Sequence, residues 1–277
     1  MVIREQERTR EAWDGIAAGY DETNTPAHMW LGNEGVRRAG VGPGLRFLDV
    51  AAGSGALSIP AARLGASVLA VDISPAMLAR LEARARREGL AIETRVMDGH
   101  ALALDDDSFD VAGSQFGVML FPDMPRGIRE LARVTRPGGR VLVTAYGDPA
   151  RIDFLGFFVR AIQATVPGFT GPSMDPPPLP LQLRDPARLD RELTDAGLKA
   201  ARVETITERL EFGSGSELWR WLTHSNPIVG ALLAELDLTR QQTAVVQDML
   251  ERLVRERAGG DGRAILTNPV NIGVATK

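Results

Sequence analysis

The chain contains no cysteine, only 3 histidines and 2 tyrosines among its 277 residues, and no long hydrophobic run. Without cysteine there is no disulfide, no thiolate nucleophile and no cysteine-ligated zinc, and we expect no bound metal. No apolar run approaches the roughly 18 residues that a membrane span requires. The first residues also lack the apolar core of a signal peptide, so we expect a cytoplasmic protein.

Positive charge is not in excess either. Lys and Arg number 32 against 36 Asp and Glu, a formal net charge of −4. Arg84, Arg86 and Arg87 lie close together, but Glu82 and Glu88 flank them, a pattern typical of a solvated helix face. Because binding to a phosphate backbone needs clustered basic side chains, we expect no nucleic-acid partner. Hydrophobic residues make up 44% of the chain, enough for a large core.

Residues 45–58 are the most informative segment of the sequence. A continuous apolar run predicts a strand at 46–51, buried on both faces of a parallel sheet. Gly53 and Gly55 follow, and a second apolar run opens at Ala56. Glycines at this point allow a sharp turn and a close approach of the backbone to a ligand, with helix N-terminal amides aimed at it.

A second buried strand, expected at 67–72, ends in an acid. A carboxylate at Asp72 is placed to accept the two hydroxyls of an adenosine ribose. The alternative role, a helix N-terminal acid, is less favoured because Ser74 and Pro75 already supply a cap and a first-turn proline. Nicotinamide and S-adenosylmethionine sites share this layout. Here, however, Ser58 replaces the third glycine of the dinucleotide pattern, and no pyrophosphate loop is evident.

Five motifs in order carry a family resemblance over residues 10–148. Asp49, Gly53 and Gly55 form an acid-x-x-x-Gly-x-Gly motif, and the others lie at 67–72, 96–99, 108–117 and 136–143. The chain resembles the class I S-adenosylmethionine-dependent methyltransferases. Within them it is most similar to the small-molecule branch typified by ubiquinone and menaquinone C-methyltransferases.

The resemblance implies an α/β fold with a doubly wound, Rossmann-like methyltransferase sheet that is mostly parallel with its last strand antiparallel. The pattern of residues 213–260, which interrupts the core, predicts in addition an inserted helical cap. The resemblance also implies S-adenosyl-L-methionine as cofactor, with Asp98 at the adenine amino group and Tyr20 at the methionine carboxylate or the substrate. The expected cofactor-binding residues are Tyr20, Asp49, Ala51, Gly53, Ser54, Gly55, Asp72, Ile73, Met77, Asp98, Gly99, Gln115 and Phe116.

The remaining pattern predicts the other elements. Further strands are expected at 92–97, 110–116, 140–146 and 202–212, and helices at 4–19, 56–64, 75–88, 124–136, 152–166 and 228–236. The phase of the 202–212 strand slips between Val203 and Ile206, which predicts a bulge. Thr239 and Gln242 predict a capping box, and a final strand through 270–274 has Pro269 at its start or on an edge.

The domain expectation divides the chain into a helical lid at 1–44, a core at 45–212 and 261–277, and a cap at 213–260. The alternative, that the inserted helices merely extend the core, stays open. An aromatic or apolar methyl acceptor is indicated by five aromatic side chains, although a cap would also use them for packing. They are Trp30, Phe157, Phe158, Trp219 and Trp221.

Methyl transfer is an in-line displacement that needs alignment more than a catalytic triad, and a base only for some acceptors. Candidate bases are His28, His224 and Tyr20, with His100 and Tyr146 behind them, and none is a firm assignment. The expected function is S-adenosylmethionine-dependent methylation of a small metabolite. The alternatives are a cofactor-binding, non-methylating, pericyclase-like relative and a nicotinamide-dependent oxidoreductase.

Overall fold

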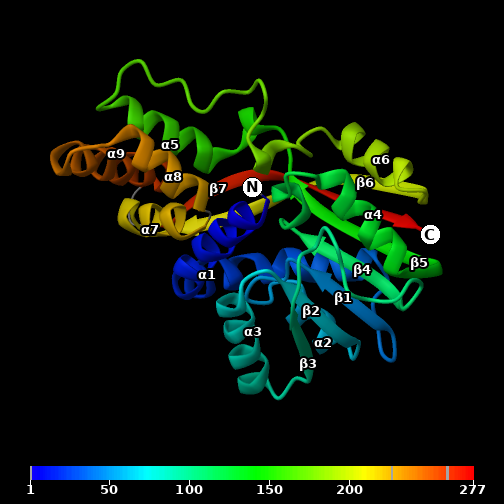
Figure 1. Ribbon diagram of the computed structural model, residues 1–277. Helices are drawn as coiled ribbons and strands as arrows, with labels where there is room; N and C mark the ends of the chain where they lie inside the picture. The colour runs from blue at the N-terminus through cyan, green and yellow to red at the C-terminus, as the bar shows by residue number, and fades with distance from the viewer. Residues whose placement is uncertain (1, 226, 260–261) are drawn as a thin grey trace.

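The computed structural model describes residues 2–225, 227–259 and 262–277. Within them, seven strands form one sheet in the order β3-β2-β1-β4-β5-β7-β6, with helices on both of its faces (Figure 1). Only β7 runs antiparallel to its neighbours, which confirms the predicted sheet. The strands are β1 Arg46–Val50, β2 Ser67–Asp72, β3 Ile92–Val96, β4 Phe109–Gln115, β5 Thr135–Tyr146, β6 Lys199–Phe212 and β7 Ala264–Thr276.

Several of the helices begin at a residue whose side chain caps them, although α2 and α5 do not. Ser74 accepts a hydrogen bond from the Met77 amide at the start of α3, and Thr239 and Gln242 form the predicted capping box of α9. The α-helices are α1 Val2–Arg38, α2 Ser58–Arg63, α3 Pro75–Glu88, α4 Met124–Val134, α5 Asp153–Gln163, α6 Pro186–Asp195, α7 Gly215–Ser225, α8 Pro227–Leu236 and α9 Arg240–Ala258. Short 3₁₀ turns are η1 Val118–Leu120, η2 Pro149–Arg151 and η3 Leu179–Leu181.

Helix α1 is twice as long as the predicted 4–19 helix and continues through Pro26 to Arg38. Its middle turns pack through polar side chains, before Leu31 and Val36 join the main apolar core. Asp21 accepts a hydrogen bond from Arg84 of α3, and the hydroxyl of Thr25 contacts that of Ser54. A helix face that is buried by hydrogen bonding shows no apolar period, so the sequence pattern ended the helix too early.

The boundary between α4 and β5 and the position of the bulge in β6 were predicted wrongly. Strand β5 begins at Thr135 rather than at 140, because Thr135 already pairs with Phe109 of β4, and α4 therefore ends at Val134. The bulge in β6 does not lie between Val203 and Ile206, where pairing with β7 is continuous. The register shifts instead between Lys199 and Arg202, where Ala200 adopts a φ of 49°.

Pro269 lies inside β7 rather than at its start. Residues 264–269 pair with β6 alone, and pairing with β5 begins only where Val270 faces Tyr146. Pro269 therefore occupies a stretch where β7 is locally an edge, so its missing N–H breaks no ladder. Its carbonyl accepts a hydrogen bond from the Gly147 amide at 2.8 Å.

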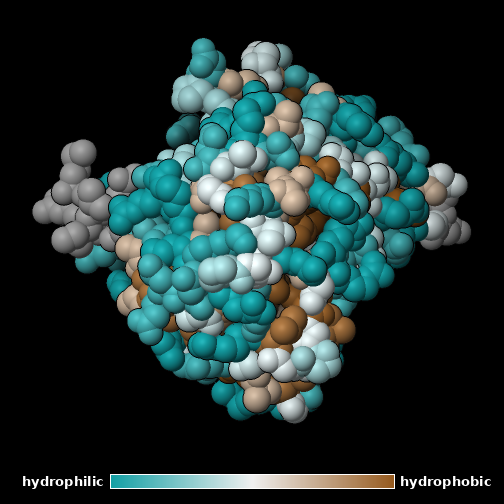
Figure 2. Space-filling model, turned by 90° about the vertical axis from the view of Figure 1, so that its right-hand side faces the viewer, coloured by the Kyte–Doolittle hydropathy of each residue, from teal (hydrophilic) through white to brown (hydrophobic). Residues whose placement is uncertain are grey.

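Two large apolar clusters hold the fold together. The main one lies on the sheet, and the second, which we call the outer cluster, joins α5, α7 and α9 to the ends of β6 and β7. Phe158, Trp221, Leu250 and Leu266 are among its buried members. Figure 2 shows a face on which hydrophilic side chains predominate and hydrophobic ones lie in hollows between them. Among the described residues, no helix combines the length and the apolar character that a membrane crossing requires.

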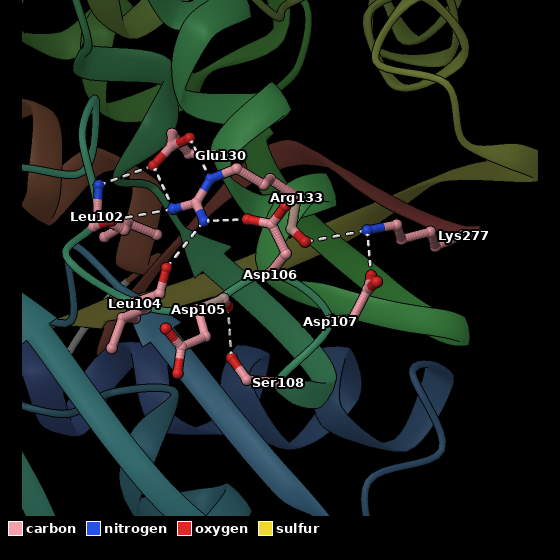
Figure 3. A network of polar contacts seen from close by, with 9 residues as sticks. All are labelled: Leu102, Leu104, Asp105, Asp106, Asp107, Ser108, Glu130, Arg133 and Lys277. Carbon is pink, nitrogen blue, oxygen red and sulfur yellow. Dashed lines mark hydrogen bonds and ion pairs between the residues drawn. The ribbon is translucent and has the colours of Figure 1, made fainter.

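The loop after β3 is fixed against α4 by Arg133 (Figure 3). Its guanidinium donates to the carbonyls of Leu102 at 2.9 Å and Leu104 at 2.8 Å, and it pairs with Glu130 at 2.7 Å. The ammonium of Lys277 donates to the Arg133 carbonyl at 2.9 Å. These contacts hold in place the loop that begins with the predicted adenine-binding residues.

Candidate active site

A cavity of about 350 Å³ opens at the carboxyl ends of β1, β2 and β4, where a doubly wound sheet binds its ligands. We call it the first cavity. Ten of the predicted cofactor-binding residues line it, namely Tyr20, Ala51, Gly53, Asp72, Ile73, Met77, Asp98, Gly99, Gln115 and Phe116. Loops far apart in the sequence thus bring most of the predicted set together.

Asp72 ties two of these loops to each other. One carboxylate oxygen accepts the Gly53 amide at 2.8 Å, and the other accepts the Ser74 amide at 2.8 Å. Burial raises the pKa of Asp72, whereas these amide hydrogen bonds oppose that rise. Each oxygen can accept a further hydrogen bond. The acid is therefore held in one orientation at the cavity wall with acceptor capacity left for a ligand.

The glycine loop after β1 divides its residues between two roles. Gly53 lines the first cavity with a φ of 53°. Gly55, with a φ of 99°, does not line it, and a Cβ there would lie 2.9 Å from Cγ of Leu81. Ser54 faces α1 through Thr25. Gly55 therefore allows the loop to approach α3 closely, while Gly53 forms the cavity wall.

Asp49 lies directly beneath the loop and is only 1% exposed. With Ser54 it lines a small hollow of about 20 Å³ that shares Tyr20 and Gly53 with the first cavity. Its Oδ2 accepts the Ser58 hydroxyl at 2.5 Å, and its Oδ1 has no partner among the described residues. Burial, assisted by the charge of Asp72, raises the pKa of Asp49 to about 7. A buried acid with an unpaired oxygen suits a ligand group that is cationic or donates hydrogen bonds.

Two cavity residues have strained backbones. Ala51 has a φ of 57° and Phe116 a φ of 56°, a region that non-glycine residues rarely occupy. They directly follow β1 and β4, and such strain concentrates at functional sites. The Phe116 ring stacks on Tyr146, with centroids 4.4 Å apart. No residue type or spacing in the sequence indicates these conformations.

Part of the first cavity was not predicted from the sequence. The sequence offers His100 only as a weak base candidate, but in the structure it lines the first cavity. Its Nδ1 lies 2.7 Å from Oδ1 of Asp98, and its ring centroid lies 4.4 Å from that of Phe121. Met97 and Gly117 lie inside expected motifs, and Thr9 and Trp13 lie on α1. Most of the others follow a motif within a few residues, so extending each motif would find them. The lining residues missed are Thr9, Trp13, Met97, His100, Gly117, Leu120, Phe121, Pro122, Asp123 and Arg126.

A second cavity, of about 310 Å³, adjoins the first and shares Trp13, Tyr20, Phe116 and Leu120 with it. Its walls come from α1, α5, α7, α8 and the proline-rich segment before η3. Tyr20 and Phe116 therefore lie where the two cavities meet.

The aromatic residues expected at the acceptor site have different positions. Phe158 and Trp221 line the second cavity. Phe157 lies beneath the Arg257 guanidinium at 5.3 Å, and Trp219 packs against the outer cluster. Trp30 is 47% exposed, so both interpretations of it, as pocket wall and as core, were wrong. It lies on the solvent side of α1, whose continuation the sequence pattern missed.

Two of the three candidate bases, His28 and Tyr20, line the second cavity, and His224 does not. His28 lines the second cavity, and its Nε2 lies 3.2 Å from Oε1 of Glu208. His224 packs so tightly against Gly19 of α1 that a Cβ there would overlap its ring, and it is not among the lining residues of either cavity. Tyr20 lines both cavities, and burial together with the charges of Asp72 and Glu208 raises its pKa. Across the described ranges, no three His, Asp or Glu side chains could hold a metal ion.

Comparison with known proteins bears on the segment that builds the first cavity. The family described as "Methyltransferase domain" matches residues 48–143. Demethylmenaquinone methyltransferase of Mycobacterium marinum is 32% identical over 208 residues, which cover 70% of this chain and 87% of that protein. An uncharacterized protein of Mycobacterium tuberculosis is 42% identical over 169 residues, covering 60% of this chain and 59% of the relative. The match thus spans about three-fifths of the latter protein's length.

Solved structures share the fold across most of the chain. A putative methyltransferase from Bacillus halodurans matches with a TM-score of 0.57 and 15% identity, covering 88% of this chain and 97% of that one. Phosphoethanolamine N-methyltransferase 2 of Haemonchus contortus in complex with S-adenosyl-L-methionine matches with a TM-score of 0.51 and 20% identity, covering 89% and 52%. At these identities the likeness concerns the fold alone.

Proposed function

The chain belongs to the S-adenosyl-L-methionine-dependent methyltransferases, and we propose that it transfers a methyl group from this cofactor to a small aromatic or apolar molecule. The observation that carries the proposal is the pair of joined cavities. The first has acids along its wall, the second is mainly apolar and aromatic, and Tyr20 and Phe116 line both.

The residues of the first cavity fit the cofactor. Asp72, at the tip of β2 with free acceptor capacity, would hold the ribose hydroxyls, and Asp98 would lie toward the adenine. The unpaired Oδ1 of Asp49 would accept the amino group of the methionine end. Ser58, the residue in place of a third glycine, is buried and donates to Asp49. A carboxylate held in this position attracts the ammonium group at the amino-acid end of S-adenosyl-L-methionine and repels the pyrophosphate of a nicotinamide cofactor.

The chain's own contribution to the reaction is positioning. S-adenosyl-L-methionine supplies, when bound, a methyl group on a positively charged sulfur that is open to in-line displacement. Tyr20 and Phe116 orient the two ligands because their rings lie at the junction of the cavities. Phe158 and Trp221 exclude water from the acceptor side, and aromatic faces at the junction also favour a cationic centre.

We propose that residues 1–44 form a lid and residues 213–260 a cap over the core of 45–212 and 261–277. Two contacts fasten α1 to α3: Asp14 accepts the Ser74 hydroxyl at 2.5 Å, and Arg84 pairs with Asp21. Trp221 from α7 and Leu232 from α8 line the second cavity. The boundary at 260–261 lies outside the described residues. A cytoplasmic location and the lack of a nucleic-acid partner stay predictions.

Calorimetry and methyl transfer test the proposal together. The protein is titrated with S-adenosylhomocysteine and separately with NAD, and it is then incubated with methyl-labelled S-adenosylmethionine and a panel of phenols, quinols and amines. We expect binding of S-adenosylhomocysteine, no binding of NAD and label in at least one aromatic acceptor. Binding without any labelled product would favour a non-methylating relative, and NAD binding alone would contradict the proposal.

A further inference from the structure

A buried acid–base pair consists of His28, which lines the second cavity, and Glu208, which lies behind it. Nε2 of His28 on α1 lies 3.2 Å from Oε1 of Glu208 on β6, and the two side chains are 5% and 1% exposed. The other carboxylate oxygen of Glu208 accepts the side-chain amide of Asn268 on β7 at 2.9 Å. Within the described residues, Glu208 forms no ion pair with Lys or Arg. The carboxylate beside Nε2 favours the tautomer of His28 that has its hydrogen on that nitrogen, which leaves Nδ1 as an acceptor.

The second ring nitrogen of His28 is unused. Nδ1 is buried and has no hydrogen-bond partner among the described residues, and Nε2 meets Glu208 at ion-pair distance without hydrogen-bond geometry. The backbone carbonyl of His28 accepts the side-chain amide of Gln115 at 3.2 Å, which fixes this turn of α1 to the end of β4. Buried polar atoms are nearly always paired, so an unpaired ring nitrogen beside a cavity points to a ligand.

His28 is placed on the acceptor side of the junction. It lines the second cavity but not the first, and its ring centroid is 5.1 Å from that of Phe116 and 6.4 Å from that of Trp221. Because Phe116 lines both cavities, the imidazole is one aromatic ring away from the first cavity. A planar acceptor held among these rings would have its polar group beside the only histidine that lines this cavity within the described residues.

We propose that His28 is the general base for a hydroxyaromatic acceptor in the second cavity, with Glu208 and Asn268 as positioning residues. This assignment rests on the proposed function. The acceptor's O–H bond breaks and its proton passes to Nδ1 of His28. The electron pair left on oxygen forms the new bond to the methyl carbon, while the pair of the broken S–CH₃ bond stays on sulfur. The proton then leaves His28 for water.

Other titratable groups near the acceptor are less suited to take the proton. Tyr20 and Tyr146 line the cavity, but burial and the charge of Glu208 raise the pKa of each, so both stay protonated. Glu235 also lines it, from an exposed position on α8. Glu208 itself lies behind His28, where it can stabilise the imidazolium that forms.

The test uses 4-nitrophenol as a coloured acceptor, because its absorbance reports whether it is ionised. The probe is titrated into protein saturated with S-adenosylhomocysteine, from about pH 5 to pH 9, for wild type, His28→Gln and Glu208→Gln, with His224→Gln as the matched control. We expect the bound probe to ionise at least about one pH unit lower in wild type than in His28→Gln. Glu208→Gln should raise the pH at which the bound probe ionises, as His28→Gln does, and His224→Gln should match wild type.

Equal midpoints in wild type and His28→Gln would overturn the proposal, as would failure of the probe to bind. If His28→Gln does not fold, an unchanged midpoint in the near-isosteric Glu208→Gln would overturn it equally. These titrations follow the ionisation of the bound probe and require no methyl transfer, so their outcome is independent of whether methyl transfer is found.

Turnover adds a readout that a merely structural role would not move. His28→Gln should reduce kcat for phenol by about a hundredfold or more. The same variant should retain most of its activity toward 4-nitrophenol in mildly alkaline buffer, where that acceptor is already ionised. Equal losses for the two phenols would contradict a role in proton removal. Loss of S-adenosylhomocysteine binding in wild type would instead defeat the proposed function.

Discussion

The two cavities meet at Tyr20 and Phe116 but are built in different ways. The first is formed mainly by loops that directly follow β1 to β4, and hydrogen bonds to backbone amides hold its central acid, Asp72. The second is formed by side chains of α1, α5, α7 and α8 that share an apolar core. The first thus depends on local motifs and the second on long-range packing, so variants should affect one without the other.

The largest expected effect is on the first cavity. Asp72→Ala removes hydrogen bonds from a charged acceptor and should weaken binding of S-adenosylhomocysteine by about 1.5–3 kcal/mol, roughly ten- to hundredfold. Asp98→Ala is the matched variant and should weaken it less, because adenine also stacks on apolar neighbours such as Ile73. Calorimetry on folded variants measures both. Unchanged affinity in Asp72→Ala would refute the ribose assignment.

A variant that fills the second cavity should have the opposite pattern, with methyl transfer reduced and cofactor affinity unchanged. Leu232 on α8 lines it and is only partly buried, so Leu232→Trp should fit with little change in folding and occupy the acceptor space. Methyl transfer to the acceptor found in the panel should fall at least about tenfold, a barrier increase of about 1.4 kcal/mol. Affinity for S-adenosylhomocysteine should stay within about twofold. If both quantities fell together, the two cavities would not be independent.

Proton release on binding tests Asp49. With a pKa of about 7 in the ligand-free protein, about half of the Asp49 carboxyls are protonated at pH 7. A cationic amino group beside it favours the ionised form, so binding of S-adenosylhomocysteine should release about half a proton at pH 7 and more near pH 6. Calorimetry in two buffers of different ionisation enthalpy measures this release. Asp49→Asn should abolish it, and equal release from wild type and variant would contradict the assignment.

The same pKa gives a stability prediction of known sign. Because burial raises the pKa of Asp49 from 3.8 to about 7, the folded state retains a proton that the unfolded chain loses. This retained proton stabilises the folded state. The stabilisation contributes fully to the unfolding free energy below pH 3.8 and decreases as the pH rises to about 7. Denaturant titrations should show this slope in wild type and a flatter one in Asp49→Asn. A steeper slope in the variant would contradict the direction.

The smallest effect is expected outside both cavities. Trp30 is 47% exposed and lines neither of them, so Trp30→Ser should change the unfolding free energy by no more than about 0.5 kcal/mol. Cofactor affinity and methyl transfer should match wild type. A clear loss of acceptor turnover would restore Trp30 to the acceptor site.

The sequence predicted the first cavity better than the second for a physical reason. Asp72 ends β2, and Gly53 and Asp98 lie in the loops after β1 and β3, so the order of these strands along the chain also fixes the place of the three residues at one sheet edge. The second cavity depends on how α1 crosses toward α7, and α1 itself was predicted only in part because Asp21 and Thr25 pack through hydrogen bonds.

The buried pair of His28 and Glu208 shows the limit most clearly. The two residues lie 180 positions apart, and no spacing links a histidine on α1 to an acid on β6. Residue type and its place in the expected lid make His28 a candidate base, whereas nothing in the sequence marks Glu208. Likewise, no residue type in the sequence marks the positive φ of Ala51 or of Phe116.

The most direct measurement is a crystal structure of the protein soaked with S-adenosylhomocysteine. We predict density for the nucleoside between Asp72 and Asp98, with the amino acid end above Asp49 and the sulfur near Tyr20 and Phe116. The second cavity should remain open on the far side of those rings. Density for the ligand elsewhere, or a first cavity without ligand at saturating concentration, would contradict the account.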